Sequence, residues 1–136
     1  MKNIYEIIDE EKIYYINHTL LNTKGMIAHS DDITAIIIDN KKISTSTEEN
    51  TILIHELGHY KAGAYYTLNS SFDMYERMEH KADKQSWEMF FPYRKIKELM
   101  HKGLTTVTQL AEYFNVEPLY MARCVHYYYE QYNGFN

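Results

Sequence analysis

The sequence predicts an α+β fold in which a small antiparallel sheet of about three strands packs on a pair of helices, followed by a helical tail. Between residues 13 and 43, short β-branched and aromatic runs alternate with turn-forming residues. From Thr47 onward, apolar residues instead recur at helical spacing. The chain has 136 residues and contains neither an internal repeat nor a Pro/Gly-rich linker. We therefore expect a single domain, with residues 1–92 forming its core and residues 93–136 forming a tail packed on that core.

The first part of the chain is predicted to contain one short helix and three strands. A helix is expected near Ile4–Ile8, because the isoleucines of that stretch share one helical face. The expected strands are Ile13–Ile16, Gly25–His29 and Ile33–Ile38. Polar, turn-forming residues at 30–32 and 39–42 flank the third strand, and Ile43 begins a brief extended segment.

The rest of the chain is predicted to be helical. Ser46 or Thr47 can cap the first of these helices, and two acidic residues in its first turn favour the helix dipole. Four further helices are expected at about Ser71–Phe90, Arg94–Lys102, Thr106–Phe114 and Pro118–Tyr129. Their boundaries are indicated by Pro92, by Gly103 and by a capping box that begins at Thr106.

His55, Glu56 and His59 form the clearest candidate site. Residues four apart lie on the same face of a helix, so His55 and His59 can hold one zinc ion about 2 Å from each imidazole nitrogen. Glu56 can take a proton from a water molecule and pass it to a leaving amine. A zinc ion held there lowers the pKa of that water and polarises a substrate carbonyl. Gly58 allows another element to approach this helix closely. The pattern predicts a zinc protease; two surface histidines on an amphipathic helix are the structural alternative.

A catalytic zinc site needs a third protein ligand and an open fourth position. Glu79, on the next predicted helix, is the best candidate, and Glu76 and His80 from the same charged stretch are rival ligands. Asp83 follows Glu79 by one helical turn and can accept the outer N–H of a liganding histidine, which fixes the tautomer of the ring. The alternative for this stretch is an ordinary solvated helix face.

Taken together, these motifs resemble those of the ImmA/IrrE metallopeptidases, a family of bacterial and phage proteins. The resemblance is carried by the stretches Thr51–His59, Glu79–Asp83 and Phe90–Pro92. It spans roughly residues 25–128, because the preceding strands and the following helix pair also stand in the family's order. The chain departs from the family pattern at Asn50, where an aromatic residue is frequent, and at residues 85–86, where Phe and Ala are frequent. These departures bear on packing and substrate fit.

The resemblance implies a zincin-type pair of helices and a role for each candidate residue. His55, His59 and Glu79 would bind Zn²⁺, and Glu56 would be the general base. It also implies the substrate, a helix-turn-helix repressor of a phage or mobile element, whose cleavage would relieve repression. A strand at the edge of the sheet, expected to be Ile33–Ile38, can pair with extended substrate backbone by strand addition.

No single residue is indicated for stabilising the oxyanion of the reaction. Several side chains lie near enough in the sequence to be candidates. They are Tyr60, Tyr65, Tyr66, Tyr75 and His80. With 14 tyrosines in the chain, each of them is also a candidate for a purely structural role.

The tail has the sequence pattern of a helix-turn-helix around Leu110–Val116, and Asn115 is suited to the left-handed conformation of the turn. A DNA-reading helix would carry several basic or amide side chains, whereas here Arg123 is the only Lys or Arg after the turn. The tail is therefore interpreted as a packing or protein-docking unit, and direct nucleic-acid binding is not expected.

Composition restricts the classes of function. A net charge of −5 argues against nonspecific attachment to nucleic acid or anionic membranes. The lone Cys124 excludes an internal disulfide, and neither a signal peptide nor a membrane-spanning run is recognised, so a cytoplasmic location is expected.

The leading hypothesis is therefore a zinc endopeptidase of narrow specificity that cleaves a protein substrate. Two alternatives belong to other functional classes. One is a zinc-containing anti-repressor that acts by docking without cleavage, and the other is a DNA-binding regulator that uses the C-terminal helices.

Overall fold

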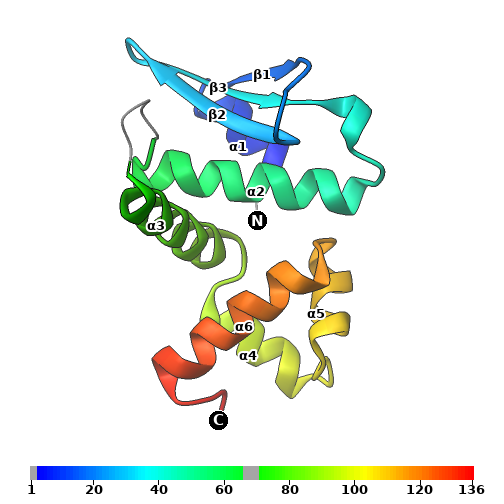
Figure 1. The fold of residues 1–136 in the computed structure, drawn as a ribbon. Helices are drawn as coiled ribbons and strands as arrows, with labels where there is room; N and C mark the ends of the chain where they lie inside the picture. The colour runs from blue at the N-terminus through cyan, green and yellow to red at the C-terminus, as the bar shows by residue number, and fades with distance from the viewer. Residues whose placement is uncertain (1–2, 66–70) are drawn as a thin grey trace.

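The computed structural model describes residues 3–65 and 71–136, and it confirms the α+β prediction, with strands first and helices after them (Figure 1). The first part contains α1 (Ile4–Glu10), β1 (Tyr14–Asn17), β2 (Gly25–Ser30), β3 (Ile33–Ile38) and the short 3₁₀ helix η1 (Asn40–Lys42). The second part contains α2 (Ser46–Ala62), α3 (Phe72–Phe90), α4 (Tyr93–His101), α5 (Val107–Phe114) and α6 (Pro118–Tyr132).

The three-stranded sheet is mixed, so the expectation of a purely antiparallel sheet was wrong for β1. The strand order is β1-β3-β2, with β1 parallel and β2 antiparallel to β3. Asp31 and Asp32, both at positive φ, form the tight turn that joins β2 to β3. Residues 18–24 connect β1 to β2 without pairing the two strands directly. β3 then lies between β1 and β2 in the sheet. Side-chain alternation determines which face is buried, but it does not determine strand direction or strand neighbours.

α2 lies beneath the sheet, and the buried sheet residues Ile36 and Ile38 belong to the same apolar cluster as Leu53 and Leu57 of α2 (Figure 1). The cap of α2 is Thr45, whose hydroxyl accepts from the Glu48 backbone at 3.1 Å, so the helix begins one residue earlier than expected. A cap one residue upstream shifts the boundary without changing which residues share a face.

α2 and α3 approach each other closely at Gly58, as predicted. A Cβ built on Gly58 would lie only 2.2 Å from the backbone oxygen of Ala82 and 2.9 Å from the Cβ of Ser86. Only glycine permits this approach, because any side chain would overlap the backbone of α3. The contact brings the face of α2 that carries the histidines against the face of α3 that carries the acidic residues.

The tail is helical, and the turn between α5 and α6 lies where the sequence predicted it. Thr106 and Gln109 form the capping box of α5, and Asn115 ends that helix in the left-handed conformation at φ 54°. Two contacts tie this turn to α2: the Asn50 side chain donates to the Asn115 carbonyl at 3.2 Å, and the Glu117 backbone donates to Thr51 Oγ1 at 2.9 Å. One apolar cluster contains buried residues of the sheet, of α2 and α3 and of the three tail helices.

Among the described residues, no helix is both long enough and apolar enough to cross a membrane.

Candidate metal centre

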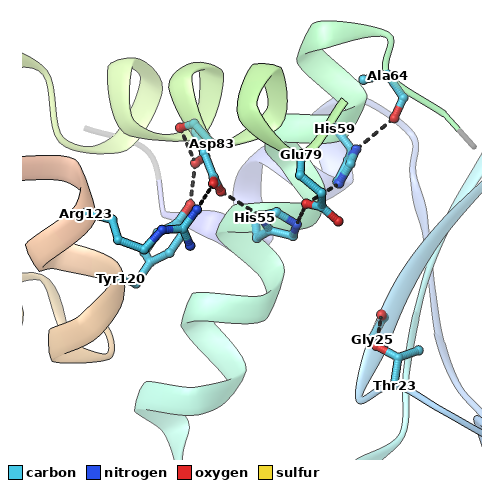
Figure 2. Close-up of polar contacts among 10 residues, drawn as sticks. Thr23, Gly25, His55, His59, Ala64, Glu79, Asp83, Tyr120 and Arg123 are labelled. Carbon is cyan, nitrogen blue, oxygen red and sulfur yellow. Dashed lines mark hydrogen bonds and ion pairs between the residues drawn. The ribbon is translucent and has the colours of Figure 1, made fainter. Parts of the chain in front are cut away.

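α2 and α3 bring His55, His59 and Glu79 together (Figure 2). The Oε2 atom of Glu79 lies 2.8 Å from Nε2 of His55 and 3.3 Å from Nε2 of His59. The two imidazole rings are nearly perpendicular, at 88°, with centroids 4.8 Å apart. The spacing of the two histidines on α2 makes them neighbours, and the close approach of the helices at Gly58 brings the carboxylate of α3 to them.

The outer nitrogen of each imidazole is already engaged. Nδ1 of His55 lies 3.1 Å from Oδ1 of Asp83, and Nδ1 of His59 lies 2.7 Å from the backbone carbonyl oxygen of Ala64 (Figure 2). Because a carboxylate and a carbonyl can only accept, both Nδ1 atoms donate when the rings are neutral, and the lone pair of each Nε2 atom then faces the Glu79 carboxylate. The sequence indicated Asp83 but not Ala64, whose acceptor is a backbone atom that any residue would supply.

This donor set fits zinc. Two ligand atoms held 2.0–2.1 Å from one tetrahedral ion lie about 3.3 Å apart, close to the separations at Glu79. Three nitrogen or oxygen donors beside a cavity leave an open side at which a bound metal ion could take a further ligand.

The electrostatics around His55 favour a cation at this place. Burial lowers the pKa of His55, but hydrogen bonds to Asp83 and Glu79 outweigh burial and raise the pKa to about 10. Glu56, only 7% exposed, has its pKa raised by burial, an effect that His55 and His59 partly oppose. The chain therefore surrounds the two histidines with carboxylates that would stabilise a positive charge there.

A cavity of about 880 Å³ opens over these residues. β2 and the loop before it line one wall through residues 23–27, and α2 forms the floor. The start of α6 contributes a further wall through Glu117, Tyr120 and Arg123. Sequence reasoning missed this contribution of the tail, because nothing in the local pattern of α6 indicates which element it faces.

Of the rival residues, Glu76 and His80 lie outside the cluster of potential metal ligands found among the described residues. His80 instead lines a second cavity of about 610 Å³ between α3 and α6. His80 is one residue after Glu79 on α3, so its side chain projects in a different direction from that of Glu79.

Among the candidates for the oxyanion role, Tyr75 lines the cavity, and the Glu79 charge is the main cause of its raised pKa. Two other tyrosines have partners elsewhere: Tyr60 donates to Glu11 at 2.9 Å, and the Tyr65 ring stacks on His29 with centroids 4.6 Å apart. Tyr66 lies outside the residues that the structure describes.

The expectation that Ile33–Ile38 forms an edge strand was wrong. This segment is β3, the central strand, and its backbone pairs with β1 on one side and β2 on the other. The sheet edge that lines the cavity is β2. The apolar residues of β3 indicate which of its faces are buried, whereas the number of neighbouring strands depends on sheet topology, which the local pattern does not reveal.

Comparisons with known proteins agree with this geometry. Residues 10–123 match the profile of a peptidase family described as the IrrE N-terminal-like domain. The chain belongs to this family. Metallopeptidase ImmA of Bacillus subtilis (strain 168) is 27% identical over 121 residues, which cover 84% of this chain and 69% of that protein. No solved structure matches the chain.

Membership of the IrrE N-terminal-like family confirms the resemblance inferred from the motifs, and it supports a metal-dependent peptidase with a protein substrate. The match includes α2 and α3 completely and extends into α6 as far as Arg123. The family profile therefore covers the cavity-lining part of the tail as well as the two helices that carry the candidate ligands.

Proposed function

We propose that this chain is a zinc endopeptidase of narrow specificity that cleaves a helix-turn-helix repressor of a phage or mobile element and so relieves repression. The observation that carries the proposal is the convergence of two Nε2 atoms and one carboxylate oxygen at the floor of a cavity, with both outer nitrogens held by acceptors. Cleavage in the cytoplasm, where a repressor acts, is part of the same proposal.

In this proposal, His55, His59 and Glu79 hold Zn²⁺ through the three donor atoms that face one another. Bound zinc supplies Lewis-acid polarisation of the substrate carbonyl and makes a water molecule more acidic. Glu56 accepts the proton of that water and delivers it to the amine of the leaving segment. Its burial keeps the carboxylate poorly solvated, which makes it a better proton acceptor than an exposed glutamate.

The substrate would lie along β2 in an extended conformation. β2 is an edge strand beside the cavity, so one row of its backbone N–H and C=O groups has no neighbouring strand in the sheet. Strand addition there would bring a peptide bond of the substrate over the histidines. Tyr75, which lines the same cavity, is our candidate for stabilising the oxyanion.

The decisive experiment is incubation of the purified protein and zinc with the repressor encoded beside it, followed by mass spectrometry. The matched control is Glu56→Gln, which keeps side-chain size but cannot accept the proton. We expect one defined cleavage product with the unchanged protein and a rate lower by at least about 100-fold with the variant, which still binds zinc. A repressor left intact by the unchanged protein under every metal condition would refute the proposal.

The same variant separates cleavage from docking. If Glu56→Gln still relieves repression in cells, the anti-repressor that docks without cutting becomes the better explanation. For the DNA-binding alternative, the test is salt-dependent binding of the purified chain to its own promoter. We expect none, because Arg123 is the only Lys or Arg of α6 and it is engaged by Asp83.

Once the cleavage site is mapped, the strand-addition step can be tested on its own. Peptides N-methylated at single amides beside the scissile bond should be cleaved more slowly at alternate positions, because alternate backbone groups of a strand face the same neighbour. A uniform effect along the peptide would contradict pairing with β2.

A further inference from the structure

Arg123 of α6 connects the tail to the candidate metal centre. Its Nη2 donates to Oδ2 of Asp83, and the other carboxylate oxygen of Asp83, Oδ1, lies 3.1 Å from Nδ1 of His55 (Figure 2). Three side chains from three helices thus form a continuous line of polar contacts that ends on a proposed zinc ligand.

The burial of Asp83 makes its orientation dependent on these partners. Its side chain is only 2% exposed, so water cannot solvate the carboxylate, and an unpaired charge there would be costly. Each of its two oxygens has one charged or chargeable partner, His55 on one and Arg123 on the other. A guanidinium pairs with a carboxylate in a preferred planar geometry, so Arg123 determines which oxygen remains for the imidazole.

Packing holds Arg123 in this position. Its side chain is 54% exposed, yet the guanidinium carbon lies 5.8 Å from the ring centroid of the buried Trp87. A second residue of α6, Tyr120, shares a hydrogen bond with Ser86, whose hydroxyl donates to the Asp83 carbonyl at 2.8 Å. α6 therefore contacts both the side chain and, through Ser86, the backbone of Asp83.

We propose that Arg123 is a positioning residue, which orients the Asp83 carboxylate and, through it, the imidazole of His55 for metal binding. The inference rests on the proposed function of His55 as a zinc ligand. It assigns the tail a role in the peptidase site, so that residues 93–136 complete the site instead of serving only to dock partners. If Arg123 served only to attach the tail, its loss would change stability without changing metal affinity in the folded state.

The experiment measures the dissociation constant for Zn²⁺ by competition with a chromophoric chelator, at a temperature where circular dichroism shows every variant folded. We expect Arg123→Gln to weaken zinc binding by about three- to tenfold. Asp83→Asn removes the direct partner of His55 and should weaken binding by about 10- to 100-fold. Because Arg123 acts through Asp83, the double variant should bind zinc no more weakly than Asp83→Asn alone.

Lys84→Gln is the matched control. The Lys84 ammonium lies 5.8 Å from the ring centroid of Tyr127 of α6, and it lines the same second cavity as Arg123. The Lys84→Gln substitution therefore removes a cation and a cation–π contact between α3 and α6, and it leaves the contacts of the Asp83 carboxylate in place. We expect zinc affinity within about twofold of the unchanged protein.

A second variant covers the case in which Arg123→Gln does not fold. Arg123→Lys keeps the charge but loses the planar fork, so we expect weaker zinc binding and an altered visible spectrum of the Co²⁺-loaded protein. Unchanged affinity in both Arg123 variants, or an equal loss in Lys84→Gln, would overturn the inference. An unchanged protein that binds no zinc would refute the proposed function instead, so the two failures are distinguishable.

Discussion

Replacing Gly58 with alanine tests whether the close approach of α2 and α3 sets the geometry of the metal centre. The added Cβ would lie 2.2 Å from the Ala82 backbone oxygen, whereas real contacts of this kind are at least 3.0 Å. The helices must therefore separate locally by about 0.8 Å. A flexible side chain could yield to a new methyl group, but the backbone of a helix cannot do so without moving the helix.

The expected change in the free energy of unfolding is a loss of about 2 kcal/mol. Overpacking in a well-packed interior costs about 1–3 kcal/mol, and a rigid backbone neighbour places Gly58→Ala at the upper end of that range. Alanine has a better helix propensity than glycine, which offsets about 1 kcal/mol of this loss in the free energy of unfolding. For a chain of this length, the net loss lowers the melting temperature by about 4–8 °C.

The same displacement acts on the metal centre. Glu79 and Asp83 are on α3, whereas the histidines are on α2, so a separation of about 0.8 Å exceeds the tolerance of about 0.2 Å for metal–ligand distances. We expect zinc affinity to fall by about tenfold or more.

The assays are urea denaturation of the metal-free protein and a zinc titration of the folded protein. Lys61→Ala, an exposed substitution on the same helix, is the control and should change neither quantity appreciably. A Gly58→Ala protein that is as stable as the unchanged chain and binds zinc equally well would refute the close approach at Ala82.

Three further predictions concern stability. Tyr128→Phe should stabilise the protein by about 1 kcal/mol in urea denaturation, because the Tyr128 hydroxyl is buried and has no hydrogen-bond partner among the described residues; a loss of stability would mean that the hydroxyl is bonded. Asn115→Ala should cost about 1–2 kcal/mol and Asn115→Gly less, since Asn115 is at φ 54° and glycine adopts that conformation without strain. Equal losses would assign the whole cost to the hydrogen bonds of the Asn115 side chain with Ser46 and Thr47, which both variants remove. Zinc at 100 times its dissociation constant should raise the free energy of unfolding by about 2.7 kcal/mol, and a chelator should abolish the gain; no shift in the melting temperature would count against a zinc site.

Local chemistry made much of this molecule predictable. The spacing of His55 and His59 places them on one face of any α-helix, whatever surrounds it. The left-handed turn at Asn115 and the cap formed by Thr106 likewise depend on residues within one turn of each other. Helix periodicity, capping and turn chemistry act over a few residues, so a single sequence is enough to reveal them.

The tertiary structure decided the relations between distant segments. The parallel pairing of β1 with β3 depends on the path of the loop before β2, and the acceptor for His59 is a backbone carbonyl that no side chain reveals. The contact of Arg123 with Asp83 joins residues 40 positions apart. The sequence by itself determined which side chains can bind a metal and on which helix face they lie. Which acceptors orient them, which strand borders the cavity and which helix completes it depend on long-range packing, because burial and steric fit are properties of the whole chain.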